Sequence, residues 1–303
     1  MAIASDSIRR ARPLLGTFVE IEAAADRRSG TERAIEAAFD AVAQVHRLMS
    51  FHEGDSEVSR LNREAGIRPV RVHDWTYEVL ATAVELHRRS SSLFDVTIAP
   101  ALQTLGLLPL LEDRLAPAPL ASCADAIELL PDHQVRFRSS DVMIDLGGIA
   151  KGFAVDRAVA VLRDFGISGG MVNAGGDLRA FGAESHTVHV RDPRDPGRPV
   201  CSIEIADEAL ASTARRVELF DRREPGGSAV IDPATRRPAS LVDGVTIRAP
   251  SCMIADALTK VVMIAGTDAG ELLESYCAGA LLISTDGGVQ ITSDWHHRVH
   301  LAA

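Results

Sequence analysis

The segment from Asp145 to Arg157 changes from a strand pattern to a helix pattern across two adjacent glycines. The apolar run at residues 142–146 predicts a short strand, and the glycine pair then turns the chain. Apolar residues recur at helical spacing from this turn to about Phe165, which predicts a helix. Backbone N–H groups at the start of a helix, together with the helix dipole, attract anionic oxygen atoms. The segment therefore predicts a strand that leads into a helix N-terminus with a candidate anion site.

Lysine is rare in this chain, which carries 32 lysine and arginine residues together. Only Lys151 and Lys260 are lysine, and arginine supplies the positive charge everywhere else. A lysine retained where arginine is the rule indicates a position that needs a compact ammonium group. Lys151 lies in the first turn of the predicted helix, where a positive charge opposes the helix dipole, and a phosphate ligand would account for it. A tight turn followed by a solvated lysine is the plainer interpretation of the same pattern.

The second lysine follows Asp256 by four residues, on a helix predicted for residues 254–265. At about 100° per residue, Asp256 and Lys260 share one face of this helix. As a surface pair they would contribute only roughly 0.2–0.5 kcal/mol. The surrounding residues are apolar almost all around the helix, which predicts a buried helix, and a buried Asp–Lys pair is costly unless it has a function. We therefore favour a functional role for this pair over a surface ion pair.

The order of the predicted elements indicates the fold class. Helices are predicted for residues 32–49, for 75–89 with Asp74 as N-cap, and for 254–265, while 50–62 reads as a loop with a short helical turn. Strands are predicted at residues 14–23, 142–146, 171–177, 187–191, 230–233, 245–249 and 279–284. Strands and helices are mixed without strict βαβ alternation, so we expect an α+β fold with mixed sheets packed with helices.

Charge and composition limit the class of protein. A net charge of −10 argues against a general nucleic-acid binder. No apolar run is long enough to span a membrane, and the N-terminal residues show neither a signal-peptide apolar stretch nor a cysteine for a lipid anchor. Four widely spaced cysteines without a metal-ligand pattern are typical of a reduced protein. We therefore expect a cytoplasmic protein with no membrane span and no nucleic-acid partner, whose oligomeric state is unknown.

Seven sequence blocks occur in the order and at the spacing of a known family. They are residues 14–17, 49–62, 94–97, 145–152, 173–177, 231–233 and 249–258. On these blocks the chain resembles the ApbE family, the FAD:protein FMN transferases, over about residues 12–290. The resemblance implies an α+β, ApbE-like fold with a central flavin-binding cleft. It also implies one catalytic domain at residues 12–295, an N-terminal extension at residues 1–11 and a C-terminal tail at residues 296–303.

The same resemblance implies an enzyme, a flavin transferase that uses FAD as its substrate. FMN would move from FAD to a threonine hydroxyl of a target flavoprotein, the implied protein partner, and AMP would be released. Mg²⁺ is implied at the pyrophosphate of FAD, where a metal ion neutralises negative charge. Two other functions stay open at this point. One is a non-catalytic FAD-binding relative, and the other is an FAD pyrophosphatase that yields FMN and AMP.

The functional residues of the family map onto the two lysine-containing segments and onto several apolar positions. The implied catalytic residues are Asp145, Lys151, Asp256 and Lys260. The implied metal ligands are the backbone carbonyl of Gly148 and the carboxylate of Asp256. Contacts with FAD are implied for Leu15, His52, Leu93, Phe94, Asp95, Asp145, Lys151 and Val230.

The chain departs from the family pattern at the metal site. Lys260 stands where the family has a threonine metal ligand, and Thr259, one residue earlier, points about 100° away. An ammonium group and Mg²⁺ repel each other strongly in one small site. We therefore hypothesise that the Lys260 ammonium occupies the place of the metal, paired with Asp256, so that FAD binds with little or no Mg²⁺.

A second departure concerns the general base. Ala229 replaces a histidine that precedes the Ile-Asp-Pro block in the family, and this replacement, together with Lys260 at the metal site, predicts reduced activity. Asp177, Asp192 and Asp232 are three candidates for the missing base, and the sequence does not choose among them.

Overall fold

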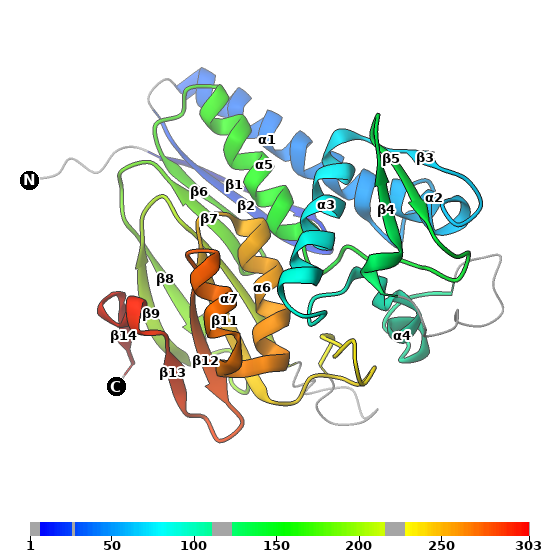
Figure 1. The fold of residues 1–303 in the computed structure, drawn as a ribbon. Coiled ribbons are helices and arrows are strands. Elements are labelled where there is room, and N and C mark those ends of the chain that lie inside the picture. Colours follow the sequence, from blue (N-terminus) through cyan, green and yellow to red (C-terminus); the bar gives the residue numbers. More distant parts are fainter. Residues whose placement is uncertain (1–6, 26–27, 111–122, 216–227, 303) are drawn as a thin grey trace, which may run out of the picture.

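The computed structural model describes residues 7–25, 28–110, 123–215 and 228–302. Its centre is an eight-stranded antiparallel sheet in the order β1-β2-β6-β7-β10-β11-β12-β13 (Figure 1). The strands are β1 (Ser7–Leu14), β2 (Thr17–Ala24), β6 (Gly170–Ala174), β7 (Asp177–Phe181), β10 (Ala209–Ala214), β11 (Val242–Ala249), β12 (Gly279–Ser284) and β13 (Val289–Ile291).

Three helices cover one face of this sheet and lie side by side: α1 (Arg28–Met49), α5 (Ala150–Asp164) and α6 (Cys252–Ala265) (Figure 1). Between the helices and the sheet lies the larger hydrophobic core, to which α1 contributes Ile35, Phe39 and Val42 at helical spacing. α6 packs against both α5 and strands β10 and β11, so even its polar residues Asp256 and Thr259 are fully buried. The buried helix predicted at residues 254–265 is therefore confirmed.

A three-stranded sheet, β14 (Val299–Leu301), β9 (Pro199–Ile205) and β8 (His186–Arg191), covers the other face of the central sheet. Alternation along β10 divides its side chains between the two cores, because successive residues of a strand point to opposite faces. Leu210 lies in the core under the small sheet, while Ala209 and Ala211 lie in the core under the helices. Trp295, from the 3-10 segment η4 (Ser293–Arg298), is fully buried in the smaller core.

The remaining elements form a lobe beside α1 and α5 (Figure 1). The lobe contains α2 (Glu57–Glu64), α3 (Asp74–Arg89), α4 (Ala99–Thr104), the 3-10 turns η1 (Val96–Ile98) and η2 (Ala124–Ala126), and the small sheet β3 (Val70–Arg71), β5 (Gln134–Phe137), β4 (Ile127–Leu130). After α6 come η3 (Gly266–Ala269) and α7 (Gly270–Ser275). No helix among the described residues is both long and apolar enough to cross a membrane. The predicted α+β class with helices packed on sheets is confirmed.

The prediction of a strand at residues 142–146 is wrong. The side chain of Asn62 forms the hydrogen bonds to backbone groups of this segment that a neighbouring strand would otherwise form. The Asn62 amide donates to the carbonyl oxygen of Ile144 at 2.9 Å and accepts from the N–H of the same residue at 2.8 Å. The N–H of Asp145 donates to the carbonyl of Val96 at 2.8 Å. The run is apolar because it is buried, and burial on all sides produces the same sequence pattern in an irregular segment as in a strand.

The predicted strand at residues 230–233 is also wrong, since only a single bridge joins Ile231 to Pro238. The segment at residues 50–62, predicted as a loop with a short helical turn, contains most of helix α2, which continues to Glu64. Its N-cap Ser56 accepts a hydrogen bond from the N–H of Ser59 at 3.0 Å.

The N-cap of α3 is His73 instead of the predicted Asp74. Its Nδ1 accepts a hydrogen bond from the N–H of Trp75 at 3.1 Å, and this nitrogen therefore satisfies a free donor of the first turn.

Both ends of the described chain enter sheets. Residues 7–11, which the sequence reading assigned to an extension, lie in β1 and pair with β2. The tight turn between these strands holds Leu15 and Gly16 at φ values of 56° and 70°. Residues 299–301, assigned to a tail, pair with β9 as strand β14.

Candidate functional site

A cavity of about 990 Å³ lies where the β1–β2 turn, the end of α1, the start of α5 and the middle of α6 meet. All eight residues predicted to contact FAD line it: Leu15, His52, Leu93, Phe94, Asp95, Asp145, Lys151 and Val230. Gly148 and Lys260 line the cavity as well, whereas the side chain of Asp256 is fully buried behind it. The fold thus brings widely separated segments of the chain to one hollow.

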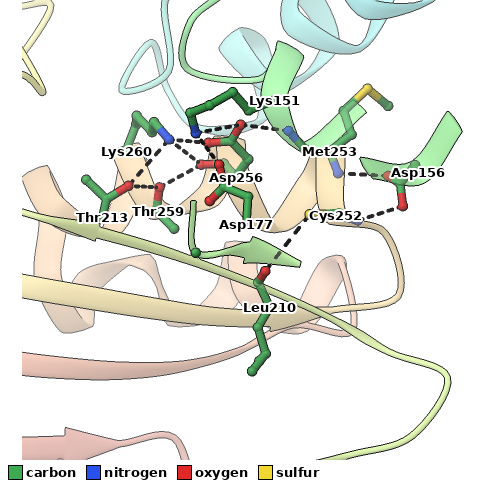
Figure 2. A network of polar contacts seen from close by, with 12 residues as sticks. Lys151, Asp156, Asp177, Leu210, Thr213, Cys252, Met253, Asp256, Thr259 and Lys260 are labelled. Atoms are coloured by element: carbon green, nitrogen blue, oxygen red, sulfur yellow. Dashed lines mark hydrogen bonds and ion pairs between the residues drawn. The ribbon is translucent and has the colours of Figure 1, made fainter. Parts of the chain in front are cut away.

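The two lysines of the chain meet at the carboxylate of Asp256 (Figure 2). Lys260 forms an ion pair with Oδ1, and the Nζ of Lys151 lies 3.8 Å from Oδ2. The ammonium group of Lys260 also donates to the carbonyl oxygen of Asp256 at 3.1 Å and to Oγ1 of Thr213 at 3.4 Å. Lys260 and Asp256 therefore form a buried pair on one helix face, as their spacing predicted.

Lys151 forms its closest ion pair with Asp177, the first residue of β7 (Figure 2). The side chains of Asp177 and Asp256 are 1% and 0% exposed, while those of Lys151 and Lys260 are 34% and 18% exposed. The negative groups therefore lie behind and the positive groups face the cavity. The sequence names Asp177 only as a candidate base. Gly175 and Gly176 precede it, and this glycine pair is the one local feature of the sequence that predicts a turn immediately before the carboxylate.

Burial and neighbouring charges shift the pKa values in this cluster. Burial alone would lower the pKa of Lys151, but the charges of Asp256 and Asp177 outweigh it and raise that pKa above its ordinary value. Burial would raise the pKa of Asp256, but Lys151 and Lys260 lower it below its ordinary value. Burial, with the like charge of Asp256, raises the pKa of Asp177. At neutral pH, Lys151 is therefore an ammonium group and Asp256 a carboxylate.

A glycine lets α5 approach α6 closely enough to form the cluster. The N–H of Gly152 donates to Oδ2 of Asp256 at 3.0 Å. A Cβ at Gly152 would lie 2.2 Å from the carbonyl oxygen of Cys252 and 2.8 Å from the Cβ of Asp256. Any side chain here would push the helices apart, and the adjacent Lys151 would then lose its position beside the carboxylate.

Asp156, one turn further along α5, caps the N-terminus of α6 (Figure 2). Its carboxylate accepts hydrogen bonds from the N–H groups of Cys252 at 3.0 Å and Met253 at 2.8 Å, and from the hydroxyl of Ser251 at 2.8 Å. Arg179 pairs with the same carboxylate at 2.6 Å. Sequence reasoning missed this residue, because a carboxylate within one helix carries no local sign that it caps another.

Four N–H groups of the turn before α5 donate within the turn, so these four are not available to the anion site predicted there. The carboxylate of Asp145 accepts hydrogen bonds from the N–H groups of Gly147 and Leu146, and burial nevertheless raises its pKa. The N–H groups of Ile149 and Ala150 both donate to the carbonyl of Leu146. The ammonium groups of the two lysines, instead of these N–H groups, therefore provide the positive charge on this wall of the cavity.

A buried histidine fixes the segment that contains Leu93, Phe94 and Asp95. The Nδ1 of His87 lies 2.9 Å from the carbonyl oxygen of Phe94, so this nitrogen carries the proton and donates it. Asp95 accepts hydrogen bonds at 2.7 Å from both the N–H and the hydroxyl of Thr97. These contacts hold the backbone of the segment at the cavity wall. The spacing of the histidines gave no sign of this role for His87.

The donor set around Asp256 is occupied by the Lys260 ammonium and does not fit an additional Mg²⁺, which requires near-octahedral oxygen ligands at about 2.0–2.1 Å. Oδ1 is bound by Lys260, and Oδ2 accepts from Gly152 with Lys151 beyond it. Oγ1 of Thr213 contacts both the ammonium of Lys260 and, at 2.7 Å, the hydroxyl of Thr259. Two unit charges about 4 Å apart repel each other by roughly 4 kcal/mol at an effective dielectric constant of 20, and a divalent ion doubles this cost.

The hydroxyl of Thr259 cannot serve as a substitute ligand facing the cavity. It donates to the carbonyl oxygen of Asp256 at 2.7 Å and is fully buried against β10 through Thr213. Ala229, which replaces the family histidine, does line the cavity.

None of the three carboxylates considered as the missing base lines this cavity. Asp177 is buried with Lys151, and Asp192 lies at a separate hollow of about 650 Å³ beside β8. Asp232 accepts hydrogen bonds from Ala234 and Thr235 within its own turn, at 2.8 and 2.9 Å.

The sequence profile of the ApbE family matches residues 15–281. The chain belongs to the ApbE family. The ApbE relatives include proteins named FAD:protein FMN transferase from Vibrio cholerae, 27% identical over 94% of this chain and 90% of that protein, and from Treponema pallidum, 26% identical over 96% and 88%. These ApbE relatives are transferases that act on flavin.

Solved ApbE structures show the same fold. The ApbE protein of Thermotoga maritima superimposes with a TM-score of 0.85 at 25% identity, over 97% of this chain and 99% of that one. The flavin transferase ApbE of Vibrio cholerae gives a TM-score of 0.80 at 26% identity, over 97% and 99%. The ApbE fold therefore extends over nearly the whole chain.

Proposed function

We propose that this protein is an FAD:protein FMN transferase, which moves FMN from FAD to a threonine hydroxyl of a target flavoprotein and releases AMP. The observation that carries the proposal is the charge cluster of Lys151, Asp177, Asp256 and Lys260 in the wall of a cavity with a largely apolar lining. Membership of the ApbE family and the names of its relatives support the same function.

The cluster has two positive and two negative groups, yet it presents positive charge to a ligand. Asp177 and Asp256 are almost completely buried, and the partly exposed ammonium groups of Lys151 and Lys260 lie in front of them. A dinucleotide pyrophosphate carries its negative charge on compact oxygen atoms, which two ammonium groups can contact together. The ordered carboxylates hold the ammonium groups in place, so little reorganisation is needed when the ligand binds.

The rest of the cavity suits the ring systems of FAD. Leu15, Leu93, Phe94 and Val230 supply apolar surface to it. Its volume of about 990 Å³ lies at the upper end of the range of about 300–1,000 Å³ for small-molecule sites, as a dinucleotide requires.

The transfer needs one bond to form and one to break. The threonine oxygen of the target bonds to the phosphorus of FMN, and the anhydride P–O bond to AMP breaks. AMP leaves as an anion, and the ammonium groups of Lys151 and Lys260 stabilise the charge that develops on its phosphate. The hydroxyl proton passes to solvent, because Ala229 offers no base. We therefore expect slow transfer.

The test is to incubate the purified protein with FAD and a target flavoprotein domain, and to measure flavin bound covalently to the target and free AMP. Equal amounts of covalent FMN and AMP, absent when the acceptor threonine of the target is replaced by alanine, are the expected result. AMP released without a target would indicate a pyrophosphatase instead. FAD that binds and stays intact would indicate a non-catalytic flavin binder.

A further inference from the structure

We infer that Lys260 is a built-in substitute for a divalent cation, so that this protein binds the pyrophosphate of FAD without Mg²⁺. The inference rests on the proposed function for the identity of the ligand, FAD. The evidence is the oxygen cage around the Lys260 ammonium and its position at the cavity wall.

The groups around the Lys260 ammonium are those that a hard cation would take. Three oxygen atoms surround its Nζ: a carboxylate oxygen of Asp256, the backbone carbonyl oxygen of Asp256 and the hydroxyl of Thr213. Carboxylate, carbonyl and hydroxyl oxygens are typical ligands of Mg²⁺ and Ca²⁺. An ammonium group has three N–H donors, which match three oxygens. The side chain therefore fills a cation site with a charge that is covalently part of the chain.

The position of the side chain leaves the charge available to a ligand. Lys260 lines the cavity, and its stem packs against the turn before α5, where a Cβ on Gly148 would lie 3.5 Å from Cε of the lysine. Lys260 and Asp256 lie four residues apart on one helix, and this spacing keeps the ammonium group beside the carboxylate. If the ammonium group moved out of the site, it would lose this ion pair.

The charges of the cluster already balance without a metal. Lys151 and Lys260 offset Asp177 and Asp256, and all four groups are linked by ion pairs. A divalent ion at Asp256 would add two positive charges beside two ammonium groups. Among the described residues, no carboxylate other than Asp177 and Asp256 is bonded to these lysines, so none offsets the added charge. Mg²⁺ could enter only by displacing Lys260 from its carboxylate.

Two measurements on the full chain test the inference. The first is FAD affinity from flavin fluorescence, in EDTA and in Mg²⁺. We expect dissociation constants that agree within about twofold in the two buffers, which corresponds to a difference of about 0.4 kcal/mol. The second is calorimetry of Mg²⁺ alone, without FAD, where we expect no stoichiometric binding.

Three variants sharpen the test. Lys260→Thr should bind FAD at least about tenfold more weakly in EDTA, and Mg²⁺ should restore its affinity. Lys260→Met should show the same loss without restoration by Mg²⁺. Arg163→Met is the matched control, because it also removes a cation paired with an aspartate, Asp207, but on a part of α5 that does not line the cavity. We expect it to bind FAD like the parent protein.

The outcomes separate this inference from the proposed function. FAD binding to the parent protein that requires Mg²⁺, or stoichiometric Mg²⁺ binding to it, would overturn the inference and leave the transferase proposal intact. An unchanged FAD affinity in Lys260→Met would overturn it as well. Absence of FAD binding in both buffers would overturn both proposals.

Discussion

The backbone N–H of Gly152 in α5 donates a hydrogen bond of 3.0 Å to the carboxylate of Asp256 in α6. This contact joins the two segments that carry the lysines of the chain, and it is made where the helices are too close for any side chain on the glycine. The positions of Lys151 and Lys260 therefore depend on the packing of one helix against the other, and changes at the helix contact should affect both stability and FAD binding.

Gly152→Ala should destabilise the protein and weaken FAD binding. The new Cβ would lie 2.2 Å from a backbone carbonyl, and overpacking of this kind costs about 1–3 kcal/mol. Urea denaturation and flavin fluorescence measure the two effects. Gly270→Ala is the control, because a Cβ at that helical position meets nothing within 4 Å. Similar losses of stability in both variants would show that the close helix contact is not the cause.

Asp156→Ala should destabilise the protein by about 2–4 kcal/mol, because it leaves the first N–H groups of α6 and the guanidinium of Arg179 without their carboxylate. The free energy of unfolding from urea titration gives the value. Asp207→Asn removes an exposed negative charge that pairs with Arg163 and keeps a residue type that tolerates the φ of 51° at this position, so it should change stability by less than about 0.5 kcal/mol. If the two variants lose equal stability, Asp156 does not act as the cap of α6.

Lys151→Met should lose both stability and FAD affinity, since it leaves the buried carboxylate of Asp177 without its ion pair. Removal of one partner from a buried ion pair costs about 3–5 kcal/mol, and we expect a loss of up to this size. The double variant Lys151→Met with Asp177→Asn should recover most of the stability but not the FAD affinity. Recovery of both would mean that Lys151 only neutralises Asp177 and does not contact the ligand.

Asp145→Asn should raise the melting temperature at neutral pH. Burial raises the pKa of Asp145 in the folded protein above its unfolded value, so stability falls as the pH rises from the unfolded pKa to that raised pKa, and the loss is complete above it. The advantage of the variant should disappear as the pH falls below about 3.9, the ordinary pKa of aspartate, where the carboxyl is protonated in both states. Thermal denaturation at a series of pH values measures this difference.

Asp286→Asn should change stability in the opposite direction to Asp145→Asn at neutral pH. A hydrogen bond from Ser284 lowers the pKa of the exposed Asp286, so its carboxylate favours the folded state above the unfolded pKa. This variant should be less stable than the parent at neutral pH, and the difference should vanish as the pH falls through the folded pKa. A higher melting temperature for Asp286→Asn, or a lower one for Asp145→Asn, would contradict the assigned shifts.

Periodic segments were predicted well from the sequence. The strand predicted at residues 279–284 has the bounds of β12, and the helix predicted at 254–265 starts within two residues of α6. The apolar pattern predicted the wrong structure where a buried segment is neither a helix nor a strand. The run at 142–146 is apolar, but the side chain of Asn62, far away in the sequence, takes up the backbone groups of Ile144. No pattern within the run distinguishes the two cases.

The sequence by itself determined that Asp256 and Lys260 form a pair on a buried helix, because a separation of four residues places two side chains on one helix face whatever surrounds them. It also singled out Lys151 as the other lysine of the chain. Only the tertiary structure decided that Lys151 reaches Asp177 and Asp256. That contact depends on the close approach of two helices at Gly152 and on the start of β7, and distances between separate elements are set by packing, which no local spacing encodes.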